Sequence, residues 1–103
     1  MDEGQNYQWV EVARSTLDVL KEDKLKARAK KFKGMGPFTL GDIFKYLCGE
    51  VKELREEIIT QHGIEAKSGI FSGYMPIMKE IADVINCAEI LAGVLTEYNT
   101  KRK

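Results

Sequence analysis

The chain has 103 residues, enough for one domain with a real core. Its 16 Lys and Arg residues balance its 16 Asp and Glu residues, so no net charge attracts nucleic acid or an anionic membrane. No apolar run approaches the ~20 residues that span a bilayer, and the acidic start is unlike a secretory signal peptide. We therefore expect a single cytoplasmic domain over residues 1–103, without a nucleic-acid or membrane partner.

The first predicted helix covers about residues 7–31. Its apolar residues recur at spacings of three and four, at Val10, Ala13, Leu17 and Leu20. Its basic last turns suit the negative end of a helix dipole, and they make Lys30 and Lys31 candidate partners for phosphate oxygens. A solvated helix end explains these lysines equally simply. Trp9 is a candidate stacking face for a nucleotide base, although a Trp in this position is more often part of a core.

The second predicted helix covers about residues 40–61. Thr39 is a candidate N-cap, and Asp42 three residues later gives a start that resembles a capping box. One apolar stripe follows, made of Leu40, Ile43, Phe44, Leu47, Val51, Leu54 and Ile58. Gly63 is expected to end this helix, which makes the adjacent His62 a C-terminal cap.

A loop is predicted over residues 63–75, and its length in so small a domain is typical of a functional segment. The third predicted helix covers about residues 76–98, with Pro76 in its first turn. Its apolar stripe consists of Ile77, Ile81, Val84, Ala88, Leu91 and Leu95. No segment alternates with period two, so the chain is expected to be all-α.

Three such helices predict an antiparallel bundle that is incomplete in one chain. Four apolar residues fall outside the main stripes, namely Ile59, Ile85, Ala92 and Val94. A second copy of the chain would bury them, because bundles commonly close between protomers. We therefore expect a homo-oligomer, either a dimer or a tetramer.

Two acidic pairs, Glu50/Glu53 and Glu80/Asp83, border the stripes of the second and third helices. Residues three apart share one face of a helix, so two neighbouring helices would aim four carboxylates at one point. Carboxylate oxygens are the ligands that Mg2+ prefers, and Mn2+ is its expected substitute. The spacing alone is also typical of solvated surface charge. Asn86, one turn beyond Asp83, adds a group able to orient a ligand or a metal-bound water.

The segments around these pairs resemble a known family. Residues 47–54 read LCGEVKEL and residues 80–86 read EIADVIN. This pattern is similar to the signature of the MazG-like all-α nucleoside triphosphate pyrophosphohydrolases, which is EExxE on one helix and ExxD on the next. The resemblance covers about residues 40–95. Gly49 replaces the first Glu of the family pattern, which puts the number of metal ions and the rate of turnover in question.

The resemblance implies Mg2+-dependent hydrolysis of a nucleoside or deoxynucleoside triphosphate to the monophosphate and pyrophosphate. The implied metal ligands are Glu50, Glu53, Glu80 and Asp83. Either Glu50 or Glu53 would accept the proton of the attacking water, and Glu57 would be an outer-shell acid. Two alternatives on the same fold remain, phosphoribosyl-ATP pyrophosphatase and a dUTPase or dCTPase. A non-catalytic helical oligomer that binds a partner is an alternative of another class.

Overall fold

The computed structural model describes residues 7–34 and 39–101, and the side chains of residues 7–22, 24–30 and 39–100. Over this part of the chain the protein is all-helical, as the sequence predicts. Its helices are α2 (Gln8–Gly34), α3 (Leu40–Ser68) and α4 (Tyr74–Lys101).

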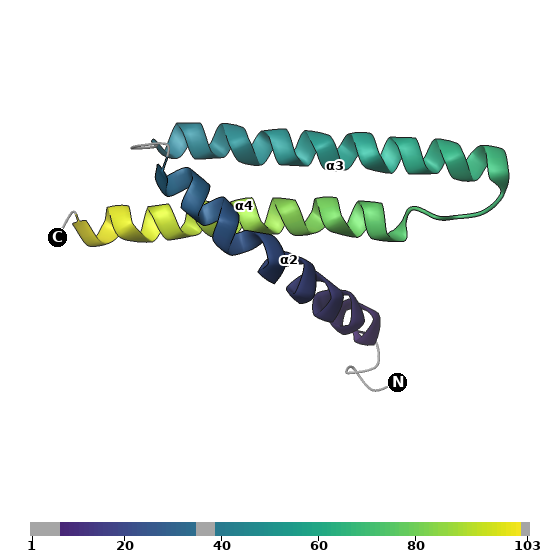
Figure 1. Cartoon of the computed structure of the whole chain (residues 1–103), viewed down its shortest axis with the longest axis horizontal. Helices are drawn as coiled ribbons and strands as arrows, with labels where there is room; N and C mark the ends of the chain where they lie inside the picture. The colour runs from purple at the N-terminus through teal and green to yellow at the C-terminus, as the bar shows by residue number, and fades with distance from the viewer. Residues whose placement is uncertain (1–6, 35–38, 102–103) are drawn as a thin grey trace.

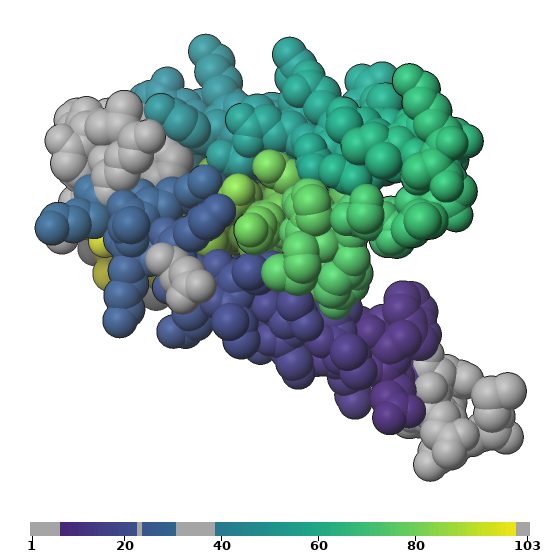
Figure 2. All heavy atoms as spheres, turned by 45° about the vertical axis from the view of Figure 1, so that its right-hand side comes forward, coloured from purple at the N-terminus to yellow at the C-terminus, as the bar shows by residue number. Residues whose placement is uncertain are grey.

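The last helix, α4, lies between the other two. α3 and α4 run antiparallel side by side, and α2 crosses α4 obliquely (Figure 1). A space-filling view shows the surface of α4 between α3 and α2 (Figure 2). The backbones of α2 and α3 make no contact with each other within residues 7–34 and 39–101. The predicted antiparallel arrangement therefore describes α3 and α4, whereas, among the described helices, α2 crosses α4 alone.

The start of α3 is fixed by a capping box between Thr39 and Asp42, as predicted. Thr39 has an extended backbone, and its Oγ1 accepts a hydrogen bond from the Asp42 amide at 3.1 Å. The Asp42 carboxylate in turn accepts a hydrogen bond from the Thr39 amide at 3.1 Å. These hydrogen bonds hold the pKa of Asp42 below its ordinary value. A cap of this kind stabilises a helix by about 1 kcal/mol.

The predicted end of this helix is wrong. α3 continues through His62 and Gly63 to Ser68, so His62 is not a C-terminal cap. The helix ends at Gly69, whose φ of 74° is left-handed and whose amide donates to the Glu65 carbonyl at 2.8 Å. A glycine inside a helix costs only about 1 kcal/mol, which the cooperative hydrogen bonding of a long helix offsets. The positive φ, which the sequence does not display, identifies the true stop.

The predicted loop of residues 63–75 is correspondingly reduced to residues 69–73. α4 begins at Tyr74, and Pro76 lies in its first turn, where its missing amide hydrogen is not needed. Gly73 is buried against α3, and a Cβ atom at this position would lie 2.6 Å from Cβ of Gln61. The absence of a side chain at Gly73 therefore lets the connection return closely onto α3.

The buried residues are concentrated on α4. The buried apolar side chains are Ile43, Met78, Ala82 and Cys87, and the buried polar ones are Asp83 and Asn86. Cys48 is exposed, and neither it nor Cys87 forms a disulfide. None of the helices in the described part of the chain is long and apolar enough to cross a membrane. The core thus lies where α4 meets its two neighbours, and it includes two polar side chains.

Candidate metal centre

Three carboxylates converge at the centre of the molecule. Glu50 of α3 and Glu80 and Asp83 of α4 each offer one oxygen atom, and these atoms lie within 4.8 Å of one another. We call these three residues the acidic cluster. The i, i+3 spacing explains why Glu80 and Asp83 point the same way, and the antiparallel packing of α3 and α4 adds Glu50. Three of the four predicted metal ligands are therefore together.

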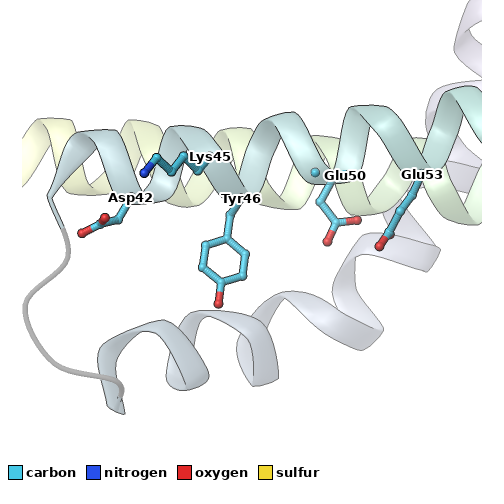
Figure 3. A pocket seen from close by; sticks show the side chains of 6 residues that line it. Asp42, Lys45, Tyr46, Glu50 and Glu53 are labelled. Carbon is cyan, nitrogen blue, oxygen red and sulfur yellow. The ribbon is translucent and has the colours of Figure 1, made fainter.

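The fourth predicted ligand, Glu53, lies beside the acidic cluster and is exposed. Its charge nevertheless reaches the cluster, because it contributes to the raised pKa of both Glu50 and Glu80. Figure 3 shows the side chains of Glu50 and Glu53 pointing to the same side of α3. Glu57, one turn further on, is half-buried and accepts a hydrogen bond from Nε2 of Gln61 at 3.0 Å. Glu53 and Glu57 thus add two carboxylates of α3 next to the acidic cluster.

The acidic cluster holds buried oxygen atoms without hydrogen-bond donors. They are Oε2 of Glu50, Oε2 of Glu80 and Oδ1 of Asp83. Asp83 is only 8% exposed, so water does not compensate its carboxylate freely. Buried polar atoms in proteins are usually paired, and an unpaired charged oxygen is especially costly. Oδ1 of Asp83 has the cationic groups of Arg28 and Lys24 at 3.6 and 3.8 Å, whereas the two glutamate oxygens have no ion pair with any described side chain, and the acidic cluster as a whole could hold a metal ion.

The raised pKa values of Glu50 and Glu80 also indicate that the acidic cluster has too little positive charge around it. Burial is the main cause that raises the pKa of Glu50, and the charges of Glu53 and Asp83 raise it further, while Arg28 opposes them. Burial also raises the pKa of Glu80, followed by the charges of Asp83 and Glu53. Both shifts favour the neutral acid, which means that the ionised cluster lacks sufficient compensation.

Arg28 of α2 is the main compensating residue. Its Nη1 atom lies 3.2 Å from Oε1 of Glu50 and donates to the Asp83 main-chain carbonyl at 3.3 Å. Its Nη2 atom lies 3.6 Å from Oδ1 of Asp83, an ion pair longer than a hydrogen bond. Lys24, one turn earlier and half-exposed, lies 3.8 Å from the same Oδ1 atom. Arg28 therefore joins all three helices.

The sequence contained a signal for Arg28 that our prediction missed. The apolar stripe of the first helix passes through Leu17 and Leu20, and steps of four from Leu20 reach Lys24 and then Arg28. These basic residues thus continue the face that packs against α4. A cation on the inner face of an otherwise apolar helix indicates a buried acidic partner.

Asn86, predicted to bind substrate, is fully buried between α4 and α2. Its Nδ2 atom donates to the main-chain carbonyl of Lys21 at 3.4 Å, and its Oδ1 atom has no hydrogen-bond partner. Nearby, Lys21 forms an ion pair with Glu89. The contact of Asn86 therefore joins two helices of the same chain.

The remaining predicted substrate-binding residues lie on α2. Trp9 is 73% exposed in the first turn, roughly 28 Å along the helix from Arg28 at 1.5 Å per residue. Lys30 is exposed, and the side chain of Lys31 lies outside the described residues. Within one chain, Trp9 is therefore not brought to the acidic cluster.

A pocket of about 430 Å³ adjoins the acidic cluster. It is lined by residues that follow one face of α3, namely Asp42, Lys45, Tyr46, Gly49, Glu50 and Glu53 (Figure 3). Lys45 and Tyr46 were not predicted as site residues, although they follow Asp42 by three and four residues, a spacing that places residues on one face of a helix. The pocket brings a cation and an aromatic ring next to the carboxylates.

Comparisons of this chain with protein-family models, with curated proteins and with solved structures found no match. The MazG-like resemblance therefore rests on residues 47–54 and 80–86 alone. Any functional proposal depends on the acidic cluster and on the pocket beside it.

Proposed function

We propose that the protein hydrolyses a nucleoside or deoxynucleoside triphosphate to the monophosphate and pyrophosphate in the presence of Mg2+. One observation carries this proposal. Three carboxylates from two helices bring oxygen atoms within 4.8 Å of one another, and each has a buried oxygen without a donor. The resemblance to the MazG-like pyrophosphohydrolases then supplies the reaction.

The acidic cluster has the chemistry of a divalent-cation site. Its donors are hard carboxylate oxygens, which suit Mg2+ and Mn2+. Glu80 forms no ion pair with any residue whose side chain the structure describes. The charge of Lys24 lowers the pKa of Glu80 less than burial and the neighbouring carboxylates raise it, so the positive charge near Glu80 is insufficient. When bound, Mg2+ supplies the positive charge that lets a triphosphate approach carboxylates and that offsets charge developing on the phosphoryl oxygens.

Within this proposal, Glu53 accepts the proton of the attacking water. It borders the acidic cluster and lines the pocket, but it is not one of the three clustered carboxylates. An exposed carboxylate beside a metal site keeps a free oxygen for proton transfer. Glu50, which the sequence left as the other candidate base, is assigned to the metal together with Glu80 and Asp83.

The pocket beside the cluster is the proposed place for the substrate. Its volume of about 430 Å³ falls within the ~300–1,000 Å³ of typical small-molecule sites. Lys45 offers a positive charge to the phosphates that point away from the metal. A cytoplasmic location belongs to the proposal, since the free thiols of Cys48 and Cys87 are compatible with a reducing compartment.

A homo-oligomer is also part of the proposal. α3 exposes apolar side chains seven residues apart, with Phe44 56%, Val51 47% and Ile58 45% exposed, and Ile59 is 59% exposed. A heptad spacing of this kind is typical of a helix that packs on another helix. We expect sedimentation to give a dimer or a tetramer at micromolar concentration, and a monomer alone would contradict this expectation.

The catalytic proposal is tested by pyrophosphate release from a panel of nucleoside and deoxynucleoside triphosphates with Mg2+. Glu80→Gln keeps the shape of a cluster residue and removes its charge. We expect it to reduce turnover by at least about a hundredfold, as loss of a metal ligand should. Glu97→Gln, which changes an exposed carboxylate on the same helix, is the matched control and should keep wild-type turnover.

Two outcomes of this assay would oppose the proposal. Equal turnover in the wild type and Glu80→Gln would remove the acidic cluster from the reaction. A wild type that releases no pyrophosphate from any substrate, and whose melting temperature Mg2+ and nucleotide do not change, would favour a non-catalytic helical oligomer. Substrate preference within the panel distinguishes a dUTPase or dCTPase from a broader enzyme, and phosphoribosyl-ATP is assayed in parallel.

A further inference from the structure

One cation of the chain already lies against the acidic cluster, namely the guanidinium of Arg28. Its two terminal nitrogen atoms face carboxylates from different helices, with Nη1 3.2 Å from Glu50 and Nη2 3.6 Å from Asp83. The Arg28 side chain is only 23% exposed, and those of Glu50 and Asp83 are 14% and 11% exposed. This is a partly desolvated contact, in which charges act on one another more strongly than at a surface.

Glu50 and Asp83 are also two of the three residues that fit a divalent metal ion. A metal ion held by the cluster and the guanidinium would therefore be two cations separated by a single carboxylate. Like charges at this distance repel strongly in a partly buried site. When a metal ion binds, either the Arg28 side chain moves away from the acidic cluster, or its repulsion lowers the affinity for the metal.

We propose that Arg28 is a built-in counter-cation of the acidic cluster, which stabilises the metal-free protein and opposes the binding of a divalent metal ion. This inference rests on the proposed function, because it assigns the cluster to a metal. It predicts a reciprocal coupling between the two cations. A bound metal ion should reduce the contribution of Arg28 to the free energy of unfolding by the same amount as Arg28 reduces the free energy of metal binding. A residue that merely packs would show no coupling to the metal, and one that orients the metal ligands would show a coupling of the opposite sign.

Arg28 also has a structural role that the experiment must separate from this one. Among the residues whose side chains are described, the Arg28–Glu50 contact is the only ion pair between α2 and α3. Loss of Arg28 will therefore lower stability in any case. The informative quantity is how much the loss of stability caused by the Arg28 substitution changes when metal is added.

The test is a titration of Mn2+ without nucleotide, read by the electron paramagnetic resonance signal of free Mn2+, on the wild type and three variants. Arg28→Gln removes the charge, and Arg28→Lys keeps it. Lys21→Gln removes a charge of α2 that pairs with Glu89 outside the acidic cluster. We expect Arg28→Gln to tighten Mn2+ binding by about tenfold or more, because a repelling charge has gone.

Arg28→Lys should stay within about threefold of the wild type because its charge remains, and Lys21→Gln should bind Mn2+ as the wild type does. Melting temperatures give an independent readout. Arg28→Gln should melt below the wild type without metal, and saturating Mn2+ should reduce that difference. If Arg28→Gln is unfolded without metal, its refolding by Mn2+ supports the inference, and failure to refold opposes it.

Three other outcomes would count against the inference. Unchanged Mn2+ affinity in Arg28→Gln would overturn it, and pyrophosphate release by the wild type would then leave the proposed function standing. Weaker affinity would make Arg28 a positioning residue for the ligands, which also overturns the inference. Absence of Mn2+ binding in every protein, together with no pyrophosphate release, would overturn both proposals.

Discussion

The side-chain amide of Asn86 donates a hydrogen bond to the main-chain carbonyl of Lys21 at 3.4 Å and ties α4 to α2. Asn86 is fully buried, and its other amide atom, Oδ1, has no hydrogen-bond partner. The sequence predicted instead that Asn86 binds substrate. The two roles differ in what a negative charge at this position would do.

Asn86→Asp is expected to destabilise the protein by about 3 kcal/mol or more at neutral pH, because it places an uncompensated charge in a buried site. Asp83 lies one turn away and adds like-charge repulsion. Urea unfolding measures the loss. Asn99→Asp, at an exposed position on the same helix, should stay within about 0.5 kcal/mol of the wild type. A similarly small effect at residue 86 would mean that its side chain meets solvent.

Two glycines on either side of the last turn of α3 should respond to alanine in opposite ways. Gly63 lies inside the helix, and no atom lies within 4 Å of the position that a Cβ would take there, so Gly63→Ala should stabilise by about 1 kcal/mol. Gly69 has a φ of 74°, which an L-residue with a side chain adopts at a cost, so Gly69→Ala should destabilise by about 1 kcal/mol.

Thermal unfolding of the two variants measures this difference, and each is the control of the other. If Gly63→Ala destabilised the protein as Gly69→Ala does, α3 would end near residue 61, as the sequence alone indicates. Opposite signs would support the longer helix.

The metal-free protein should lose stability as the pH rises from 4.5 towards neutral. The pKa values of Glu50 and Glu80 are raised above 4.5, mainly by burial, so in this range the folded chain binds more protons than the unfolded chain. Stability therefore falls until both groups are ionised in the folded state. Melting temperatures with a chelator present measure this slope. Glu80→Gln should flatten it, whereas Glu97→Gln should not.

The opposite dependence belongs to Asp42, whose pKa is lowered by its hydrogen bonds to Thr39. The contribution of Asp42 to stability is present above its ordinary pKa of 3.8 and is lost as the pH falls further.

Saturating Mn2+ should remove or reverse the loss of stability that Glu50 and Glu80 cause above pH 4.5, because metal binding requires ionised carboxylates. Stability that rose with pH without metal would contradict the raised pKa values.

Gly49 stands at the position where the MazG-like pattern has its first Glu, so a Glu can be introduced there to test the effect of a further carboxylate. No atom lies within 4 Å of a Cβ built on this exposed helical residue, so Gly49→Glu should fold normally. It should stabilise less than Gly49→Ala, since a Glu there repels Glu53 one turn away by about 0.2–0.5 kcal/mol. Its carboxylate would join Glu50 in the pocket wall, and we expect Mn2+ affinity to rise by about tenfold. Gly49→Ala, which lacks the charge, should leave that affinity unchanged.

Much of the fold could be predicted because it depends on local signals. The apolar periodicities indicate the helices, and the pair of Thr39 and Asp42 fixes the start of α3. The end of α3 could not be predicted in the same way, because Gly63 and Gly69 look alike in sequence. Only the backbone conformation, which tertiary packing selects, distinguishes a tolerated glycine from a terminal one.

The candidate site was predicted to a similar extent. The i, i+3 spacing places Glu80 and Asp83 together, and helix pairing adds Glu50. The roles of Arg28 and Asn86 depend on how α2 crosses α4, which no local pattern specifies. Residues that meet across this crossing are therefore the ones for which sequence reasoning was incomplete.

The position of α4 between two helices that precede it in the chain has a consequence for folding (Figure 1). The contacts of Asn86 with Lys21 and of Asp83 with Arg28 join residues 65 and 55 positions apart. Contacts this distant close long loops and form slowly. During synthesis α2 and α3 leave the ribosome before α4, so the faces that they pack against α4 stay exposed until α4 has emerged. Chains in which α4 is not yet complete should therefore be more prone to association with other chains than the finished protein is.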